Sequence, residues 1–309
     1  MTAVIQLNNV TKLYGDQAAL DHVSFEVPAG VVFALLGENG AGKTTAIRMM
    51  LGLAEPTAGE VRVLDLDCRR DGLEVRQRVG YVSERPTMYE WMTAAEIGWF
   101  TSGFYADGFE HRYRTHVTNF GVPLNRKLSQ MSKGMRAKVA LSLAMGHSPE
   151  LLILDEPTSG LDTMVRREFL ESMVDIAAEG RTVLLSSHQI GEVERVADIV
   201  AIMHAGRLLV LQPLEELKRT TRQLTITVAE STTPRPAMAG RVIYERRRGR
   251  QWDVLVRDLD ETSLERLRFA ESVVAVESRT PALEEIFVAY VGKDGNVEAA
   301  TPMESMSNF

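Results

Sequence analysis

The strongest chemical signal in the chain is a glycine-rich segment, GENGAGKT at residues 37–44, which we call the phosphate loop. It matches the pattern G-x-x-x-x-G-K-[ST], follows an apolar run at residues 31–36 that predicts a strand, and opens a helix predicted for residues 44–53. Glycines let backbone N–H groups close around phosphate oxygens, and a helix N-terminus adds positive potential. We therefore expect Lys43 to reach the β- and γ-phosphates of a nucleotide and the Thr44 hydroxyl to bind magnesium.

A second signal is a pair of adjacent carboxylates at the end of a predicted buried strand, LLILDEP at residues 151–157. Four apolar residues precede Asp155, whose carboxylate can hold magnesium at the strand end. Glu156 can orient or deprotonate a water molecule, and general base catalysis contributes about 10²- to 10⁴-fold to a rate. Such a pair is often a solvated strand terminus, but together with the phosphate loop it indicates a nucleoside triphosphatase.

These side chains need a scaffold, and the hydrophobic pattern predicts an α/β fold with a parallel sheet covered by helices on both faces. Short β-branched runs alternate with helical patterns through the first two thirds of the chain. The pattern between residues 85 and 150 is mostly helical, which predicts a helical subdomain within the α/β domain. The predicted strands lie at residues 4–7, 23–27, 31–36, 151–155, 182–186 and 199–203.

The pattern changes after residue 220, where closely spaced strands and two helices predict a small α+β C-terminal domain. We therefore expect one domain at residues 1–220, with its helical subdomain at about residues 85–150, and a second domain at residues 221–292. Residues 293–309 are polar and aperiodic, which is typical of a flexible tail.

Composition narrows the classes of function. The chain has 309 residues, of which 45% are hydrophobic and 25% charged, as is typical of soluble globular proteins. Its single cysteine, Cys68, excludes an internal disulfide and a cysteine-based zinc site. The formal net charge of −7 disfavours nucleic-acid partners, because affinity for phosphate backbones comes from Lys and Arg. The sequence shows no secretory signal and no apolar run of the ~20 residues that a membrane helix needs, so another chain would have to supply a membrane span.

Three further motifs accompany the phosphate loop and the carboxylate pair: MSKGM at residues 131–135, SGLD at residues 159–162 and SSH at residues 186–188. In this order and spacing, the set resembles the ATP-binding cassette family, the motor subunits of ABC transporters. The resemblance covers roughly residues 4–220. It implies a P-loop ATP-binding cassette with a helical subdomain, and it implies ATP and magnesium as ligands.

The resemblance also implies a role for each matching residue. Tyr14 would stack on adenine beside Ala19, although a tyrosine before a glycine turn can instead simply pack. Asp155 would bind magnesium, Glu156 would act on the attacking water, and His188 would contact the γ-phosphate. The residues that would cradle the phosphates are Gly37, Asn39, Gly40, Ala41, Gly42, Lys43, Thr44 and Thr45.

Ser132 and Gly134 match the signature of the family, which would close on the γ-phosphate held by a second copy of the cassette. Ser132 precedes a predicted helix, so its hydroxyl and the following N–H groups could face an anion, but a plain helix N-cap is the alternative. Asp162 would line the seam between the two copies.

The sequence departs from the family pattern at two places. Glu84 stands where the family usually has glutamine; its carboxylate can still accept from water and coordinate magnesium, but it lacks an amide donor. The usual signature LSGGQ is MSKGM here, so Lys133 and Met135 differ. Lys133 could add positive charge near the nucleotide of the partner copy or could simply point into solvent. Both departures are compatible with hydrolysis.

Residues 88–105 are rich in Met, Trp, Phe and Tyr. In the family, this neighbourhood receives a short helix of the membrane subunit, and methionine with large aromatic side chains suits such a groove, although helix core is an equal alternative. The cluster ERRRGR at residues 245–250 predicts a solvated hairpin turn, with contact to anionic lipid headgroups as the alternative. Residues 281–292 resemble part of the accessory domain that follows the cassette in a subset of bacterial ABC exporters.

Taken together, these features predict an ATPase that dimerises on ATP and drives a separate transmembrane permease. The expected dimer is a homodimer, because one chain holds all motif halves, and a heterodimer with a different cassette is the alternative. The accessory domain favours an exporter, and the motor would lie peripherally on the cytoplasmic face of the cell membrane. The alternative is a soluble ABC-family ATPase without a transport role. The single cassette and the short insert without heptads disfavour that alternative.

Overall fold

The structure is a computed structural model that describes residues 3–292. The predicted tail at residues 293–309 lies outside the described residues. The described chain separates into two compact units, residues 3–211 and residues 212–292. None of the helices within residues 3–292 combines the length and the apolar character that crossing a bilayer would require.

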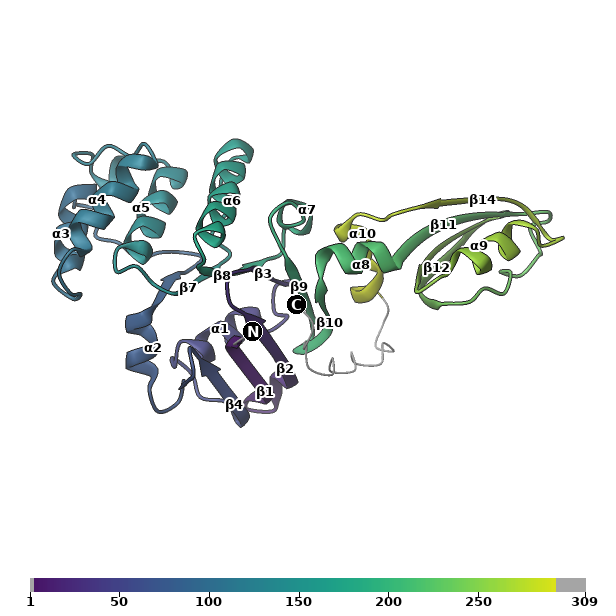
Figure 1. Cartoon of the computed structure of the whole chain (residues 1–309), viewed down its shortest axis with the longest axis horizontal. Helices are drawn as coiled ribbons and strands as arrows, with labels where there is room; N and C mark the ends of the chain where they lie inside the picture. The colour runs from purple at the N-terminus through teal and green to yellow at the C-terminus, as the bar shows by residue number, and fades with distance from the viewer. Residues whose placement is uncertain (1–2, 293–309) are drawn as a thin grey trace. The chain divides into compact units, whose positions relative to one another are not determined.

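A six-stranded sheet forms the centre of the first unit, with strand order β10-β9-β3-β8-β7-β6 (Figure 1). Strands β9, β3, β8, β7 and β6 run parallel to one another, as predicted. Strands β3, β7 and β8 are buried along their whole length, which explains their continuous apolar runs. The strands span Val32–Leu36 (β3), Val79–Val82 (β6), Leu151–Asp155 (β7), Thr182–Ser187 (β8), Ile199–His204 (β9) and Arg207–Pro213 (β10).

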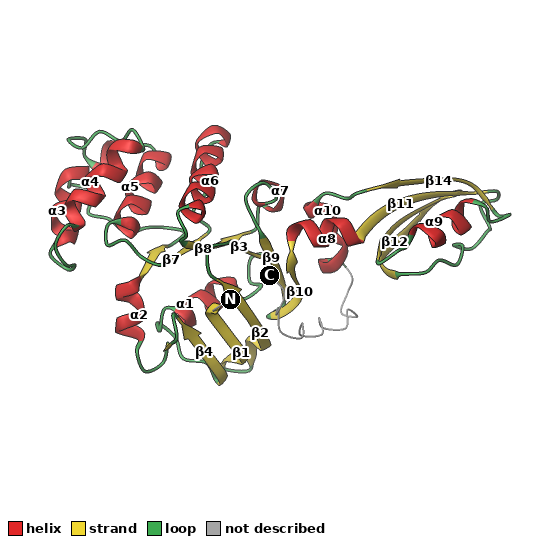
Figure 2. Ribbon diagram, in the orientation of Figure 1, coloured by secondary structure: helices red, strands yellow, loops and turns green. Residues whose placement is uncertain are grey.

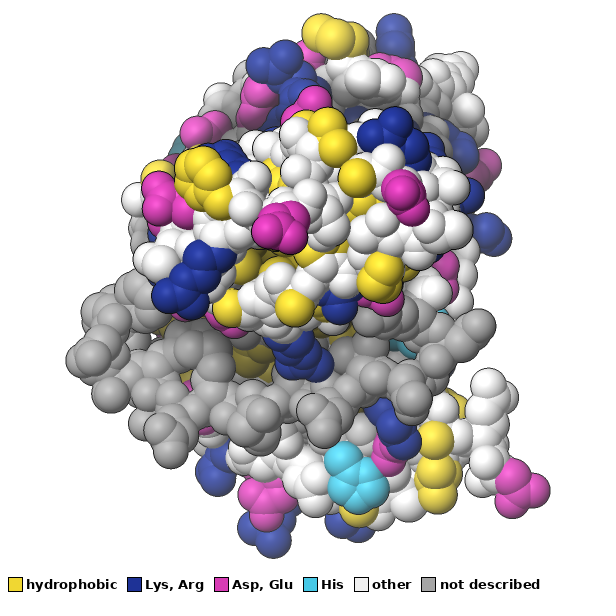
Figure 3. Space-filling view, turned by 90° about the vertical axis from the view of Figure 1, so that its right-hand side faces the viewer, with side chains coloured by type: hydrophobic (Ala, Val, Ile, Leu, Met, Phe, Trp, Pro, Cys, Tyr) yellow, Lys and Arg dark blue, Asp and Glu magenta, His cyan; other side chains and the backbone are white. Residues whose placement is uncertain are grey.

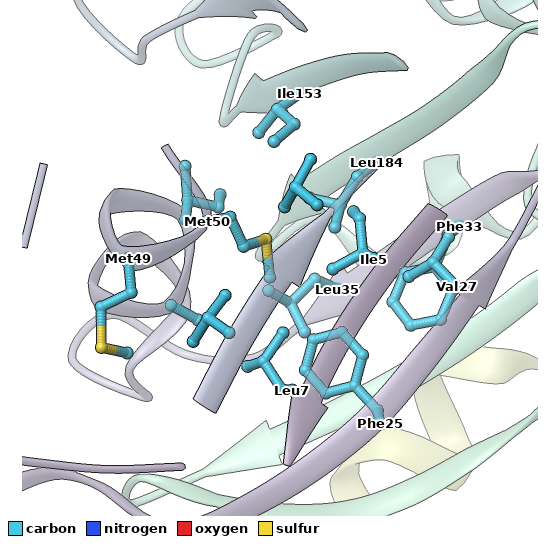
Figure 4. Close-up of a cluster of buried hydrophobic side chains, with 14 of the residues drawn as sticks. Ile5, Leu7, Phe25, Val27, Phe33, Leu35, Met49, Met50, Ile153 and Leu184 are labelled. Carbon is cyan, nitrogen blue, oxygen red and sulfur yellow. The ribbon is translucent and has the colours of Figure 1, made fainter. Parts of the chain in front are cut away.

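A second, antiparallel sheet of order β2-β1-β4-β5 packs in the same unit. It consists of Ala3–Tyr14 (β1), Gln17–Pro28 (β2), Ala58–Val63 (β4) and Leu66–Asp67 (β5). Strands β1 and β2 are longer than the predicted strands at residues 4–7 and 23–27, and they form a hairpin instead of joining the parallel sheet. The main core includes side chains from both sheets and from helix α1, Lys43–Met50 (Figure 4).

The predicted helical subdomain contains three helices, Ala94–Ser102 (α3), Phe109–Asn119 (α4) and Lys133–Met145 (α5). They have a separate core, in which the buried Tyr113 hydroxyl donates to the Ala94 carbonyl over 2.7 Å. A capping box between Thr93 and Glu96 fixes the start of α3. The remaining helices of this unit are Gly72–Arg78 (α2), Thr163–Ala178 (α6) and Ile190–Val193 (α7). The α/β fold class with a helical subdomain is thus confirmed.

The second unit is a four-stranded antiparallel sheet of order β12-β13-β11-β14. Helix α9 lies against this sheet (Figure 2), and its Leu264 and Leu267 contribute to a separate apolar core. Its elements are Leu214–Thr220 (α8), Thr221–Val228 (β11), Arg241–Arg248 (β12), Gln251–Arg257 (β13), Glu261–Arg268 (α9), Val273–Arg279 (β14) and Leu283–Val291 (α10). Helix α8 belongs to this unit, which begins at Gln212. The predicted boundary after Thr220 instead follows the last residue of α8.

The basic cluster at residues 245–250 lies at the hairpin between β12 and β13, with Gly249 at φ 60° in the turn. Its arginines have partners nearby: Arg248 lies 3.6 Å from Asp253, and the Arg247 guanidinium lies over the Trp252 ring. Basic and acidic side chains are interspersed over the face shown in Figure 3. This favours the solvated hairpin over a lipid-binding patch.

We expect the first unit to fold without the second. A chain that ends at Pro213 keeps every strand of both sheets and both cores of the first unit, so it should remain monodisperse and unfold cooperatively. Ending the chain at Thr220 instead should favour aggregation, because Leu214 and Leu217, buried in α8, would lose the β11 strand that follows them. Gel filtration and thermal unfolding of both truncated chains test this. Aggregation of the shorter chain would contradict the proposed division.

Candidate functional site

The phosphate loop connects β3 to α1 and has a backbone that only glycine adopts readily. Gly40 and Gly42 have φ of 85° and 103°, in the left-handed region. A Cβ atom on Gly42 would lie 2.6 Å from the Ala19 carbonyl oxygen, so Ala19 borders the loop, while its place beside the adenine stays a prediction. Helix α1 has no side-chain cap and no acidic residue in its first turn. The positive end of its dipole is therefore left for an anion.

Lys43 is buried at the first position of α1, and its ammonium group forms hydrogen bonds with the backbone of the loop. Its Nζ atom donates to the carbonyl oxygens of Gly37 over 2.6 Å and of Glu38 over 3.2 Å. The same atom lies 3.1 Å from Glu156 Oε1. This places a cation at the floor of the loop, against the carboxylate that the sequence assigned to the attacking water.

Glu156 joins three segments that are remote in the sequence. Its Oε2 atom accepts from His188 Nδ1 over 2.8 Å and lies 3.3 Å from the His188 backbone N–H, which also donates to it. Its Oε1 atom is buried and accepts no hydrogen bond within the described residues, so the charge of Lys43 is its only compensation there. Because β3, β8 and β7 are neighbours, their carboxyl ends bring Lys43, Glu156 and His188 together at one sheet edge.

Asp155 ends β7 and is 3% exposed. Ser186 Oγ donates to its Oδ1 atom over 2.6 Å, whereas its Oδ2 atom accepts no hydrogen bond from the described residues. Thr44 is exposed in the first turn of α1. No cluster of three His, Cys, Asp or Glu side chains suited to a metal occurs within residues 3–292. One carboxylate and one hydroxyl fit magnesium, which keeps several waters and binds substrate phosphates.

Two predicted residues are not joined to this cluster by any contact of the described chain. Glu84 is exposed, and its carboxylate lies 3.9 Å from Arg85 Nε. Its roles towards magnesium and water stay predictions. Tyr14 is half-exposed at the turn between β1 and β2, with Lys12 Nζ 5.0 Å from its ring centre. Its stacking on adenine also stays a prediction.

The signature residues have structural roles of their own within this chain. Ser132 is the N-cap of α5, and its Oγ accepts from the Met135 N–H over 3.2 Å. Gly134 is buried, and a Cβ atom there would lie 2.5 Å from Val165 Cγ1, so glycine permits the close approach of α5 to α6. Asp162 is the exposed N-cap of α6. No contact within the described residues links these three to the phosphate loop.

The segment at residues 88–105 divides between core and surface. Met92, Ala94 and Ile97 are buried in the core of the helical subdomain. A surface aromatic patch runs alongside, in which Tyr89 contacts both the Trp91 and the Phe100 rings, and Phe100 contacts Phe104. The exposed fractions of Trp91 and Phe104 are 65% and 72%. We call these residues the aromatic patch: Tyr89, Trp91, Phe100 and Phe104.

Sequence reasoning noted Ser186 only as part of the SSH motif and missed its contacts. Besides donating to Asp155, its Oγ atom accepts from the Glu156 N–H over 3.0 Å. The available signal was a polar residue that ends a run of buried apolar residues in a central strand. The pattern alone did not reveal which residue of the neighbouring strand lies opposite.

Comparison with known proteins gives consistent results. A family model described as "ABC transporter" matches residues 20–159. The bacitracin transport ATP-binding protein BcrA of Bacillus licheniformis is 35% identical over 232 residues, which cover 72% of this chain and 74% of BcrA. The Nod factor export ATP-binding protein I of Neorhizobium galegae is 34% identical over 223 residues, which cover 69% of this chain and 62% of that protein.

A solved structure described as an ATP binding subunit of an ABC transporter superposes with a TM-score of 0.63 and 31% sequence identity. The superposition covers 70% of this chain and 92% of that chain. The solved structure and the sequence relatives therefore indicate the same class of protein.

Proposed function

Because this chain belongs to the ABC transporter family, as an ATP-binding subunit that couples ATP hydrolysis to transport, we propose that it powers export through a separate permease chain. The relatives reported above are transport proteins, so the alternative of a soluble ATPase without a transport role is set aside. The Nod factor export protein is named for export, which supports export as the direction here.

The observation that carries the proposal is the contact of Glu156 with both Lys43 and His188. Lys43 can exchange its partner Glu156 for phosphate oxygens, which frees Glu156 Oε1 to accept a proton from the attacking water. His188 holds Oε2 and so fixes the direction of the carboxylate. Thr44 and Asp155 would hold magnesium, which supplies positive charge beside the phosphates when bound. General base catalysis of this kind contributes about 10²- to 10⁴-fold.

Two copies would complete the site. Ser132 is exposed at the start of α5, whose first turn contains no acidic residue, so this helix start suits an anion brought by another molecule. Since Ser132 and Gly134 make no contact with the phosphate loop of their own chain, we assign them to the γ-phosphate held by the second copy. The exposed Asp162 would then lie at the seam between the copies.

The aromatic patch is the docking surface that we assign to the permease. Exposed tryptophan and phenylalanine side chains beside a packed helical core suit an inserted helix. Docking to a permease would place the chain at the cytoplasmic face of the cell membrane as a peripheral subunit. Its formal net charge of −7 gives no support to a nucleic-acid partner.

Replacing Trp91 and Phe104 together by alanine is expected to reduce co-purification of the permease about tenfold or more, because buried aromatic anchors dominate interface energies. The ATPase rate of the isolated subunit should stay unchanged, since neither side chain contacts the phosphate loop or Glu156. Affinity purification from native membranes in mild detergent, with mass spectrometry to identify a chain that has spanning helices, measures the effect.

The matched control is Phe269→Ala, which removes an aromatic side chain that is 85% exposed on the second unit. It should leave permease recovery at the wild-type level. Equal recovery with the Trp91→Ala, Phe104→Ala double variant would rule out the aromatic patch as the docking surface. Failure of the wild-type subunit to recover any membrane-spanning chain would speak against the motor role itself.

A further inference from the structure

One polar side chain ends the buried apolar run of strand β8. Ser186 follows Val183, Leu184 and Leu185, and it is 0% exposed. Its partner in the parallel ladder is Asp155, the last residue of β7. Burying a hydroxyl is costly unless its hydrogen bonds are made, so this position demands specific partners.

Asp155 and Glu156 together use this hydroxyl both as a donor and as an acceptor. Ser186 Oγ donates to Asp155 Oδ1 over 2.6 Å and accepts from the backbone N–H of Glu156 over 3.0 Å. A hydroxyl has one proton, so the donated bond leaves its lone pairs for the N–H. The short distance to Asp155 is typical of a bond to an ionised carboxylate.

The first bond fixes the orientation of Asp155. Ser186 holds the Oδ1 atom of Asp155. The other oxygen, Oδ2, has no hydrogen-bond partner within the described residues. One oxygen of this carboxylate is thus bonded to Ser186, and the other is available to bind magnesium. A hydrogen bond behind a metal ligand orients that ligand and tunes its affinity for the metal.

The second bond fixes the backbone of Glu156. This residue has φ 50°, in the left-handed region that residues other than glycine rarely adopt. Its N–H bonds the Ser186 side chain and also the Ser186 carbonyl oxygen, the latter over 3.2 Å. The turn held in this way directs the Glu156 carboxylate between Lys43 and His188.

We propose that Ser186 is a positioning residue that sets the magnesium-facing oxygen of Asp155 and the backbone turn of Glu156 with a single hydroxyl. It touches neither nucleotide nor metal in this role and acts through its two partners. The inference rests on the proposed function, because it presumes that Asp155 binds magnesium and that Glu156 acts on water.

Ser186→Ala tests the role by removing the hydroxyl alone. We expect kcat for ATP hydrolysis to fall roughly 10- to 100-fold, as for other groups that support metal ligands. The KM for ATP should change much less, because the phosphate loop and Lys43 are untouched. With a non-hydrolysable ATP analogue bound, added magnesium should raise the melting temperature of the protein. The magnesium concentration that gives half of this rise should be about tenfold higher for Ser186→Ala than for the wild type. This second readout does not depend on turnover.

Two matched variants separate positioning from general damage to the strand. Thr182→Val removes a hydroxyl that is equally buried at the opposite end of β8, where it accepts from the Gly30 N–H over 3.0 Å. It should leave kcat and the magnesium titration unchanged. Ser186→Thr keeps the hydroxyl and should retain most of the wild-type magnesium dependence.

The outcomes are distinct. Wild-type kcat and magnesium dependence in Ser186→Ala, alongside losses in Asp155→Asn, would overturn the positioning role and leave the proposed function standing. Equal losses in Thr182→Val and Ser186→Ala would also overturn it, because any disturbance of β8 would then suffice. If Asp155→Asn itself changed neither hydrolysis nor the magnesium titration, the proposed function would fail first.

Discussion

Glu156→Gln is expected to slow ATP hydrolysis about 10²- to 10⁴-fold and to leave ATP binding intact, because the amide cannot accept a proton from water. Its size matches the carboxylate, so the contacts that its Oε2 atom makes with His188 can be kept by the amide oxygen. With ATP and magnesium the variant should accumulate as a dimer, since hydrolysis no longer removes the phosphate that bridges the copies. Gel filtration with light scattering, together with a phosphate-release assay, measures both effects.

A substitution of the signature residue Ser132 provides a matched control for this prediction. Adding Ser132→Ala to the Glu156→Gln variant should weaken the ATP-bound dimer and leave ATP binding to the monomer unaltered, since Ser132 makes no contact with its own phosphate loop. A Glu156→Gln protein that stays monomeric at saturating ATP would remove the basis for a site shared between two copies. Full hydrolytic activity in that variant would exclude Glu156 as the base.

Lys43→Ala is expected to reduce ATP affinity by at least two orders of magnitude, which corresponds to about 3 kcal/mol or more for the loss of charge-assisted hydrogen bonds to phosphate. Lys43 Nζ is the one cation within 4 Å of the buried Glu156 Oε1 atom in the described chain. Removing one partner of a buried ion pair costs roughly 3–5 kcal/mol of folding stability, and the residual exposure of Glu156 places this case towards the lower end. Calorimetric ATP titration and chemical denaturation test the two losses separately.

The double variant Lys43→Ala, Glu156→Gln separates those two effects. Neutralising Glu156 removes the uncompensated charge, so the double variant should recover much of the stability that Lys43→Ala loses. It should recover none of the ATP affinity, because the phosphate loop still lacks its cation. Wild-type ATP affinity in the Lys43→Ala single variant would refute the assignment of the phosphate loop.

Local sequence was sufficient wherever a feature depends on neighbouring residues. The phosphate loop is one contiguous segment whose glycines dictate its backbone, and β3, β7 and β8 are continuous apolar runs because both sheet faces are covered. Elements with little apolar content were missed: β4 was not predicted, since four of its six residues are exposed. Helix α8 lies in the second compact unit, whereas the prediction placed its residues in the first domain, since sequence does not tell which unit buries Leu214 and Leu217.

The sequence by itself therefore determined the family and the phosphate-loop motif, and it singled out Lys43, Asp155, Glu156 and His188 as candidate site residues, because contiguous motifs specify short-range backbone geometry and side-chain chemistry. Only the tertiary structure decided that Glu156 lies between Lys43 and His188, and that Ser186 holds both carboxylate residues. Those contacts depend on the strand order β3-β8-β7 and on the register that sets Ser186 opposite Asp155. Order and register arise from packing between segments that are distant in the chain, which no local pattern encodes.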